Sequence, residues 1–140
     1  MGKISKNVLM AAAIKAREKA CAPYSKFKVG AALLTTSGKI IPGANVESAS
    51  YGLTCCAERV ALFLALTSGE KRFSAIAVTA RFNGGAMPCG ACRQLLAEYA
   101  PDAVVWVSDS ARPREITEYR VDELLPGAFR DFRVLQLKRG

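Results

Sequence analysis

Apolar and polar positions alternate along this chain with two different periods, and each period predicts a different element. Residues 4–20 repeat apolar side chains at helical spacing and are rich in alanine, so we expect an amphipathic helix there. Short apolar runs bounded by turn residues predict strands, and the Thr-Ser-Gly-Lys sequence at 36–39 predicts a hairpin between the first two. The expected helices span 4–20, 55–67 and 90–99, with a short helical turn at 123–125. The expected strands span 29–35, 40–46, 73–80, 103–107 and 116–121.

The order of these elements predicts an α/β fold. Strands alternate with helices, which favours a sheet that is covered by helices on both faces. Residues 1–140 contain no repeat, linker or low-complexity tract, so we expect a single domain. In this arrangement the cysteine pair 55–56 and the Cys-x-x-Cys segment 89–92 both fall at helix N-termini.

Composition and charge exclude several classes of protein. Hydrophobic residues make up 51% of the 140 residues, which argues against disorder. No apolar run reaches the roughly 18 residues of a membrane-spanning helix, and the N-terminus lacks the apolar core of a signal peptide. We therefore expect a cytoplasmic protein with no membrane partner. The net charge is +8, but the basic residues are scattered, so we expect no nucleic-acid partner.

Cysteine provides the candidate chemistry. The cysteines number five, so they cannot all pair in disulfides, and because histidine is absent any metal must rest on cysteine or carboxylate. Cys89 and Cys92 are one helical turn apart, so their sulfurs can meet at one ion. Cys56 begins the other helix and can add a third thiolate. Three thiolates leave the fourth tetrahedral position of zinc open to water, which is typical of a catalytic zinc. We expect one zinc ion per chain.

Glu58 and Arg59 follow Cys56 and can support chemistry at such an ion. A carboxylate beside the open position can move the protons of a hydrolysis, so Glu58 is the candidate catalytic residue. In a regular helix Glu58 would point about 200° away from Cys56. The two converge only if the first turn is irregular or if Cys56 is a cap residue. Arg59 lies on the same face as Cys56 and can donate hydrogen bonds to its thiolate.

Two alternatives remain for the cysteines. A structural zinc could use Cys55 as a fourth ligand, although the side chains of adjacent cysteines diverge. The Cys-x-x-Cys segment could instead be a redox pair. Glu58 could be an ordinary acidic residue in the first turn of a helix.

Several segments together resemble the small homotetrameric cytidine deaminases that act on free nucleosides. The resemblance covers about residues 12–129 in unchanged order. It implies a three-layer α/β/α sandwich around a central mixed sheet of about five strands. The segments that carry it are 24–27, 29–33, 45–54, 56–59, 88–94 and 124–129.

The resemblance also implies roles for single residues. Cys56, Cys89 and Cys92 would bind zinc, and Glu58 would shuttle protons. The remaining residues would bind the substrate. Asn45 and Glu47 would hydrogen-bond the ribose hydroxyls. Phe27 would pack on the substrate, and the backbone of Ala57 would hold the pyrimidine. Ala49, Tyr51 and Phe129 would reach into the site of a neighbouring subunit.

The implied activity is the hydrolysis of cytidine and 2′-deoxycytidine to the uridine compounds with release of ammonia, as in pyrimidine salvage. The implied assembly is a homotetramer with shared active sites. The alternatives are a deaminase of another pyrimidine compound such as blasticidin S, a polynucleotide deaminase, and a non-catalytic zinc module. Cys55 departs from the family pattern, where an aliphatic residue is usual, and the basic tail 130–140 extends beyond the resemblance.

Overall fold

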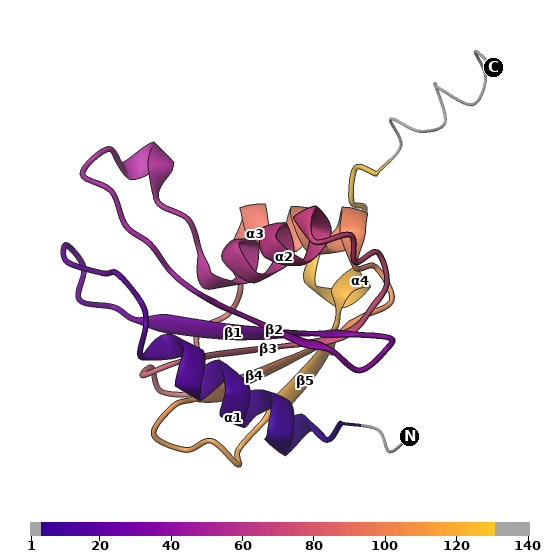
Figure 1. The fold of residues 1–140 in the computed structure, drawn as a ribbon, viewed down its shortest axis with the longest axis horizontal. Helices are drawn as coiled ribbons and strands as arrows, with labels where there is room; N and C mark the ends of the chain where they lie inside the picture. The colour runs from indigo at the N-terminus through magenta and orange to yellow at the C-terminus, as the bar shows by residue number, and fades with distance from the viewer. Residues whose placement is uncertain (1–3, 131–140) are drawn as a thin grey trace.

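One five-stranded sheet with the order β2-β1-β3-β4-β5 organises this computed structural model (Figure 1). β1 (Val29–Thr35) pairs antiparallel with β2 (Ile40–Ala44) and with β3 (Phe73–Ala80). β3 runs parallel to β4 (Val104–Asp109), and β5 (Thr117–Arg120) is antiparallel to β4. The predicted α/β class and mixed five-stranded sheet are therefore confirmed.

Helices cover both faces of the sheet and complete three layers. α1 (Lys6–Arg17) lies on one face. α2 (Ala57–Thr67), α3 (Gly90–Tyr99) and the short α4 (Val121–Leu124) lie on the other face (Figure 1). A 3-10 turn, η1 (Tyr51–Leu53), lies in the connection before α2, and this connection projects away from the sheet (Figure 1).

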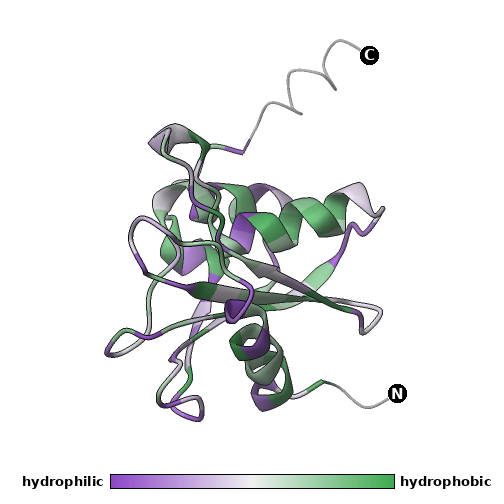
Figure 2. Ribbon diagram, turned by 60° about the vertical axis from the view of Figure 1, so that its left-hand side comes forward, coloured by the Kyte–Doolittle hydropathy of each residue, from purple (hydrophilic) through white to green (hydrophobic). Residues whose placement is uncertain are grey.

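The core is divided by the sheet because successive strand residues point to opposite faces. In β3, Ile76 and Val78 pack with α2 and α3, whereas Ala75 and Ala77 pack with α1. The small residues on the α1 side allow a close approach of that helix, since a Cβ on Gly30 would lie 2.0 Å from a backbone oxygen of α1. Figure 2 shows long apolar stretches in the helices above the sheet.

Predicted boundaries agree with the structure to within two residues, except at the C-terminal end of the first helix. That helix ends at Arg17 rather than at residue 20, because the backbone N–H groups of residues 18–20 bond to the carbonyls three residues earlier and tighten the last turn. The second strand ends at Ala44 rather than at residue 46. Val46 instead forms two isolated bridges, one with Cys21 and one with Cys55.

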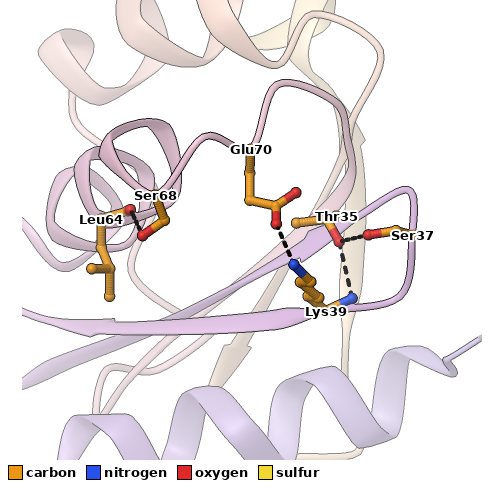
Figure 3. Close-up of polar contacts among 6 residues, drawn as sticks. All are labelled: Thr35, Ser37, Lys39, Leu64, Ser68 and Glu70. Carbon is orange, nitrogen blue, oxygen red and sulfur yellow. Dashed lines mark hydrogen bonds and ion pairs between the residues drawn. The ribbon is translucent and has the colours of Figure 1, made fainter.

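The β1–β2 hairpin is tied to the connection that follows α2 (Figure 3). The hydroxyl of Thr35 lies 2.9 Å from that of Ser37 and accepts from the backbone N–H of Lys39. The Lys39 ammonium contacts the Glu70 carboxylate at 2.8 Å. These contacts stabilise the end of β1 that lies away from the cysteine segments.

The structure describes residues 4–130. Residues 131–140 of the basic tail noted in the sequence lie outside this range. Within it, the helices are too short or too polar to cross a membrane.

Candidate active site

The starts of two helices bring three cysteines together. Cys56 is the N-cap residue of α2 and Cys89 is the N-cap residue of α3, both with extended backbone. Cys92 lies in the first turn of α3. The Sγ atom of Cys89 lies 3.7 Å from that of Cys56 and 3.4 Å from that of Cys92. All three sulfurs lie within 4.8 Å of one another.

This sulfur cluster fits a zinc ion. Zn–S bonds of about 2.3 Å in a tetrahedron place the sulfurs roughly 3.8 Å apart, and the separations above are close to that value. Cys55 is not part of the cluster. Its backbone pairs with Val46, and burial raises the pKa of its thiol. The cluster therefore offers three ligands.

Hydrogen bonds set the charge of the cluster. A hydrogen bond from the Cys92 thiol holds the pKa of Cys56 at about 5, and Arg59 and Cys89 act in the same direction. The same bond, together with burial, raises the pKa of Cys92. The opposite directions mean that, without metal, Cys56 loses its proton more readily than Cys92. The Nη2 atom of Arg59 donates to the Cys56 sulfur at 3.4 Å and to the Thr54 carbonyl at 3.2 Å.

Glu58 lies in the first turn of α2 and is buried, with 6% of its surface exposed. Burial raises its pKa to about 7, with the charge on Cys56 acting in the same direction and hydrogen bonds from its own backbone N–H and from the Cys92 thiol opposing the rise. The carboxyl group therefore lies beside the sulfur cluster. The cap position of Cys56 explains how both residues face one point, since the cap residue lies outside the regular helical rotation.

Asn45 is buried just beyond the end of β2, and its amide holds the segment that leads into β1. Its Oδ1 atom accepts from the backbone N–H of Val29 at 2.9 Å. Its Nδ2 atom donates to the Phe27 carbonyl at 2.9 Å. The β2 ladder ends at Ala44, so Asn45 lies outside it although the expected strand extended to residue 46.

Glu47 is held by residues that the sequence analysis did not assign. Its Oε1 atom accepts from the backbone N–H groups of Tyr24 at 3.1 Å and Ser25 at 3.0 Å. The Ser25 hydroxyl donates to Oε2 and accepts from the backbone N–H of Phe27. The Ser25 hydroxyl bond lowers the pKa of Glu47, and the backbone bonds assist. The turn sequence Tyr-Ser-Lys-Phe was the available signal, because serine often hydrogen-bonds in turns.

The other residues predicted to bind the substrate differ in their exposure to solvent. Ala57 is fully buried at the start of α2, and Phe27 is 37% exposed beside the ring of Phe82. Ala49 and Tyr51 lie on the projecting connection around η1, where Tyr51 is 83% exposed. Phe129 is 61% exposed, and its carbonyl accepts from Gln94 at 2.8 Å. Ala49, Tyr51 and Phe129 are therefore all exposed in the single chain.

A hollow of about 530 Å³ lies elsewhere, between α1, β2 and one residue of α2. Ala12, Lys15, Pro42 and Val60 are among its lining residues, and none of the predicted site residues lines it. The sulfur cluster therefore lies outside this hollow.

Comparisons with known proteins agree with this geometry. The family model described as "Cytidine and deoxycytidylate deaminase zinc-binding region" matches residues 3–108. A cytidine deaminase of Halalkalibacterium halodurans is 51% identical over 127 residues, which cover 90% of this chain and 95% of that protein. The crystal structure of cytidine deaminase from Burkholderia pseudomallei superposes with a TM-score of 0.86 at 48% identity, covering 90% of this chain and all of that one. A blasticidin-S deaminase of Bacillus cereus is 32% identical over 110 residues, 73% of this chain and 76% of that protein.

Proposed function

The chain belongs to the zinc-binding cytidine and deoxycytidylate deaminase family, and we propose that it hydrolyses cytidine and 2′-deoxycytidine to uridine and 2′-deoxyuridine with release of ammonia. The observation that carries this proposal is the buried carboxyl of Glu58 beside three convergent cysteines. Such a reaction belongs to pyrimidine salvage.

Cys56, Cys89 and Cys92 would hold the zinc ion, one per chain, because their sulfurs converge and Cys55 is excluded from the cluster. When bound, zinc supplies an acidified water as the nucleophile. Arg59 offsets the negative charge of the three thiolates through its bond to Cys56. The starts of α2 and α3 add roughly half a positive charge each.

Glu58 would carry the protons of the reaction. A carboxyl group with a pKa of about 7 can accept and release a proton near neutral pH. Glu58 takes a proton from the attacking water as the oxygen bonds to C4. It delivers this proton to N3, takes the remaining proton from the hydroxyl group now on C4 and gives it to the amino group, so that the C4–N bond breaks, the C4 carbonyl forms and ammonia leaves.

Asn45, Glu47, Phe27 and the backbone of Ala57 would bind the nucleoside. Asn45 uses one lone pair and one N–H on the protein backbone, which leaves one of each for a ribose hydroxyl. Glu47 is held ionised by its hydrogen bonds and can accept from a second hydroxyl. The half-exposed ring of Phe27 can pack against a flat base.

A homotetramer with shared sites would complete the substrate pocket. α2 presents the apolar side chains of Phe63 and Leu64 outward, 43% and 49% exposed, which is typical of a helix that packs against a partner. Ala49, Tyr51 and Phe129 lie on outward segments and would reach a neighbour's substrate. Closed two-fold packing would repeat these contacts at every site.

We also propose a cytoplasmic location and a single domain over residues 1–140. The described cysteines are all free, and a reducing compartment keeps such thiols available to a metal. The sheet takes strands from most of the described chain, which favours one folding unit.

A substrate panel tests the proposed activity. Zinc-loaded protein and a Glu58→Gln variant are each offered cytidine, 2′-deoxycytidine, cytosine, CMP, single-stranded DNA and blasticidin S, and ammonia release is measured. We expect turnover of the two nucleosides by the unaltered protein. Turnover of blasticidin S alone would indicate the activity for which the Bacillus cereus relative is named, and it would contradict the proposed activity on cytidine. Absence of turnover with every compound would favour the alternative that the protein is a non-catalytic zinc module.

A further inference from the structure

Two aromatic rings from distant parts of the sequence meet at the cysteine end of the sheet. Val29 lies opposite Ala80 in the β1–β3 ladder, and Phe27 and Phe82 each lie two residues beyond that pair. The ring centroids are 6.3 Å apart and the planes are inclined by 88°, an edge-to-face contact. Aromatic pairs favour this geometry because the positive edge of one ring meets the negative face of the other.

The contact is not part of the core. Phe27 is 37% exposed and Phe82 is 57% exposed. Burial therefore contributes little to holding Phe82 at this place, and an exposed phenylalanine on a connection has no evident packing function.

The backbone around Phe82 is nevertheless well held. Its N–H donates to the Ala80 carbonyl at 2.9 Å, and its own carbonyl accepts from Gly85 at 2.8 Å. Gly85 has a positive φ of 85° and lies so close to β4 that a Cβ there would be 2.6 Å from a Val107 methyl group. The connection is thus anchored to β4, and Phe82 presents its ring from a defined position.

The side chain of Phe27 needs such a partner. Asn45 and Ser25 hold the backbone of Phe27 on its carbonyl and N–H sides. These bonds leave the ring free to rotate about its side-chain torsions, and an exposed ring samples several rotamers. The ring contact with Phe82 restricts that rotation.

From this arrangement we propose that Phe82 is a positioning residue for the substrate: its ring orients Phe27 to pack against the pyrimidine. The inference rests on the proposed function, because it assumes that Phe27 touches the base. Orienting the ring before the substrate arrives removes an entropic cost from binding. Phe82 therefore acts on substrate affinity rather than on the proton transfers.

Single substitutions test this inference. Phe82→Ala is expected to raise the KM for cytidine and the Kd for the product uridine, measured by calorimetry, by roughly 2- to 12-fold, the range of an aromatic pair. The kcat, the zinc content and the Tm should stay close to those of the unaltered protein. Phe82→Tyr keeps the ring and should restore both constants. Tyr99→Ala, which removes a 47% exposed ring from the far end of α3, is the matched control.

A double-mutant cycle distinguishes an action through Phe27 from a direct contact. If Phe82 acts through Phe27, the Phe27→Ala/Phe82→Ala protein should bind uridine no more weakly than Phe27→Ala alone. Additive losses, or an unchanged KM and Kd in Phe82→Ala, would overturn the inference while the deaminase activity stands. An unaffected Phe27→Ala variant would overturn it as well. Inactivity of the unaltered protein toward cytidine would overturn the inference and the proposed function together.

Discussion

The guanidinium group of Arg59 donates a hydrogen bond to the sulfur of Cys56 at 3.4 Å, from one turn further along α2. Three thiolates outweigh the two charges of a zinc ion, so the site needs positive charge from its surroundings. Arg59 supplies it from a fixed place, because the same nitrogen also binds the Thr54 carbonyl.

Replacement of Arg59 by glutamine is expected to weaken zinc binding by about 10- to 100-fold, as is typical when a partner of a metal ligand is removed. Competition with a chelator measures the affinity. Arg17→Gln is the matched control, because that arginine binds the Lys28 carbonyl beside α1. Equal zinc affinities for the two variants would contradict the assigned role of Arg59.

Glu58→Gln should keep zinc and the fold but lose turnover by roughly 10²- to 10⁴-fold, the usual contribution of a general acid or base. The amide keeps the size of the buried side chain and cannot exchange the proton. Steady-state kinetics and metal analysis of one sample provide both readouts. Near-normal turnover of a zinc-loaded variant would show that another group moves the protons.

Cys55→Ala and Cys56→Ala form a matched pair of adjacent substitutions. The first should retain one zinc per chain because Cys55 lies outside the sulfur cluster. The second should lose most bound metal because a ligand is removed. Zinc loss from Cys55→Ala alone would show that the ligand set is wrong.

Ser25→Ala tests the network around Glu47 through its dependence on pH. The folded pKa of Glu47 lies below its ordinary 4.5, chiefly because of the Ser25 hydroxyl. The unfolded chain therefore binds this proton first on acidification, and the stability from Glu47 is present above about pH 4.5 and is lost as pH falls through the folded pKa. The Tm of Ser25→Ala should thus be lower than that of the unaltered protein at pH 7.

The same difference in Tm should shrink as the pH is lowered below about 4.5. Ser37→Ala, whose hydroxyl pairs with Thr35 in the hairpin, is the control and should show a shift that does not depend on pH. A Ser25→Ala effect that is constant from pH 7 to pH 3 would contradict the role of the Glu47 carboxylate.

Shared sites can be tested by mixing two impaired chains. Phe129→Ala should raise the KM without loss of zinc, and Glu58→Gln should abolish turnover. If a site takes Glu58 from one subunit and Phe129 from another, some mixed tetramers contain a site with both residues intact, and activity exceeds the parental average. Only average activity, or a fully active 15.0 kDa monomer in light scattering, would count against sharing.

Local patterns in the sequence were sufficient for the sheet and for the helices that carry the cysteines. They left the relation of Glu58 to Cys56 open, because a regular helix would separate the two side chains. The extended backbone of Cys56 resolves that conflict, and no residue pattern specifies it uniquely. The second strand was predicted two residues too long because the β2 ladder ends at Ala44 and Val46 pairs instead with Cys21 and Cys55.

Ser25 and Phe82 were missed because their roles arise from contacts between distant segments. Ser25 meets Glu47 across 22 residues, and Phe82 meets Phe27 only after β1 and β3 have paired. Periodicity describes which side of an element is buried. It carries no information on which connections meet at the end of a sheet.

The cysteine caps of α2 and α3 have a consequence for the stability of the protein. Ser5 caps α1 by accepting from the Val8 N–H at 3.2 Å, whereas neither cysteine cap binds a first-turn amide in the described structure. The two cysteine side chains are therefore left available to a metal ion, and bound zinc would stabilise the starts of α2 and α3 in place of a cap hydrogen bond. Metal binding is then coupled to folding, so the stability of the protein would depend on its zinc content.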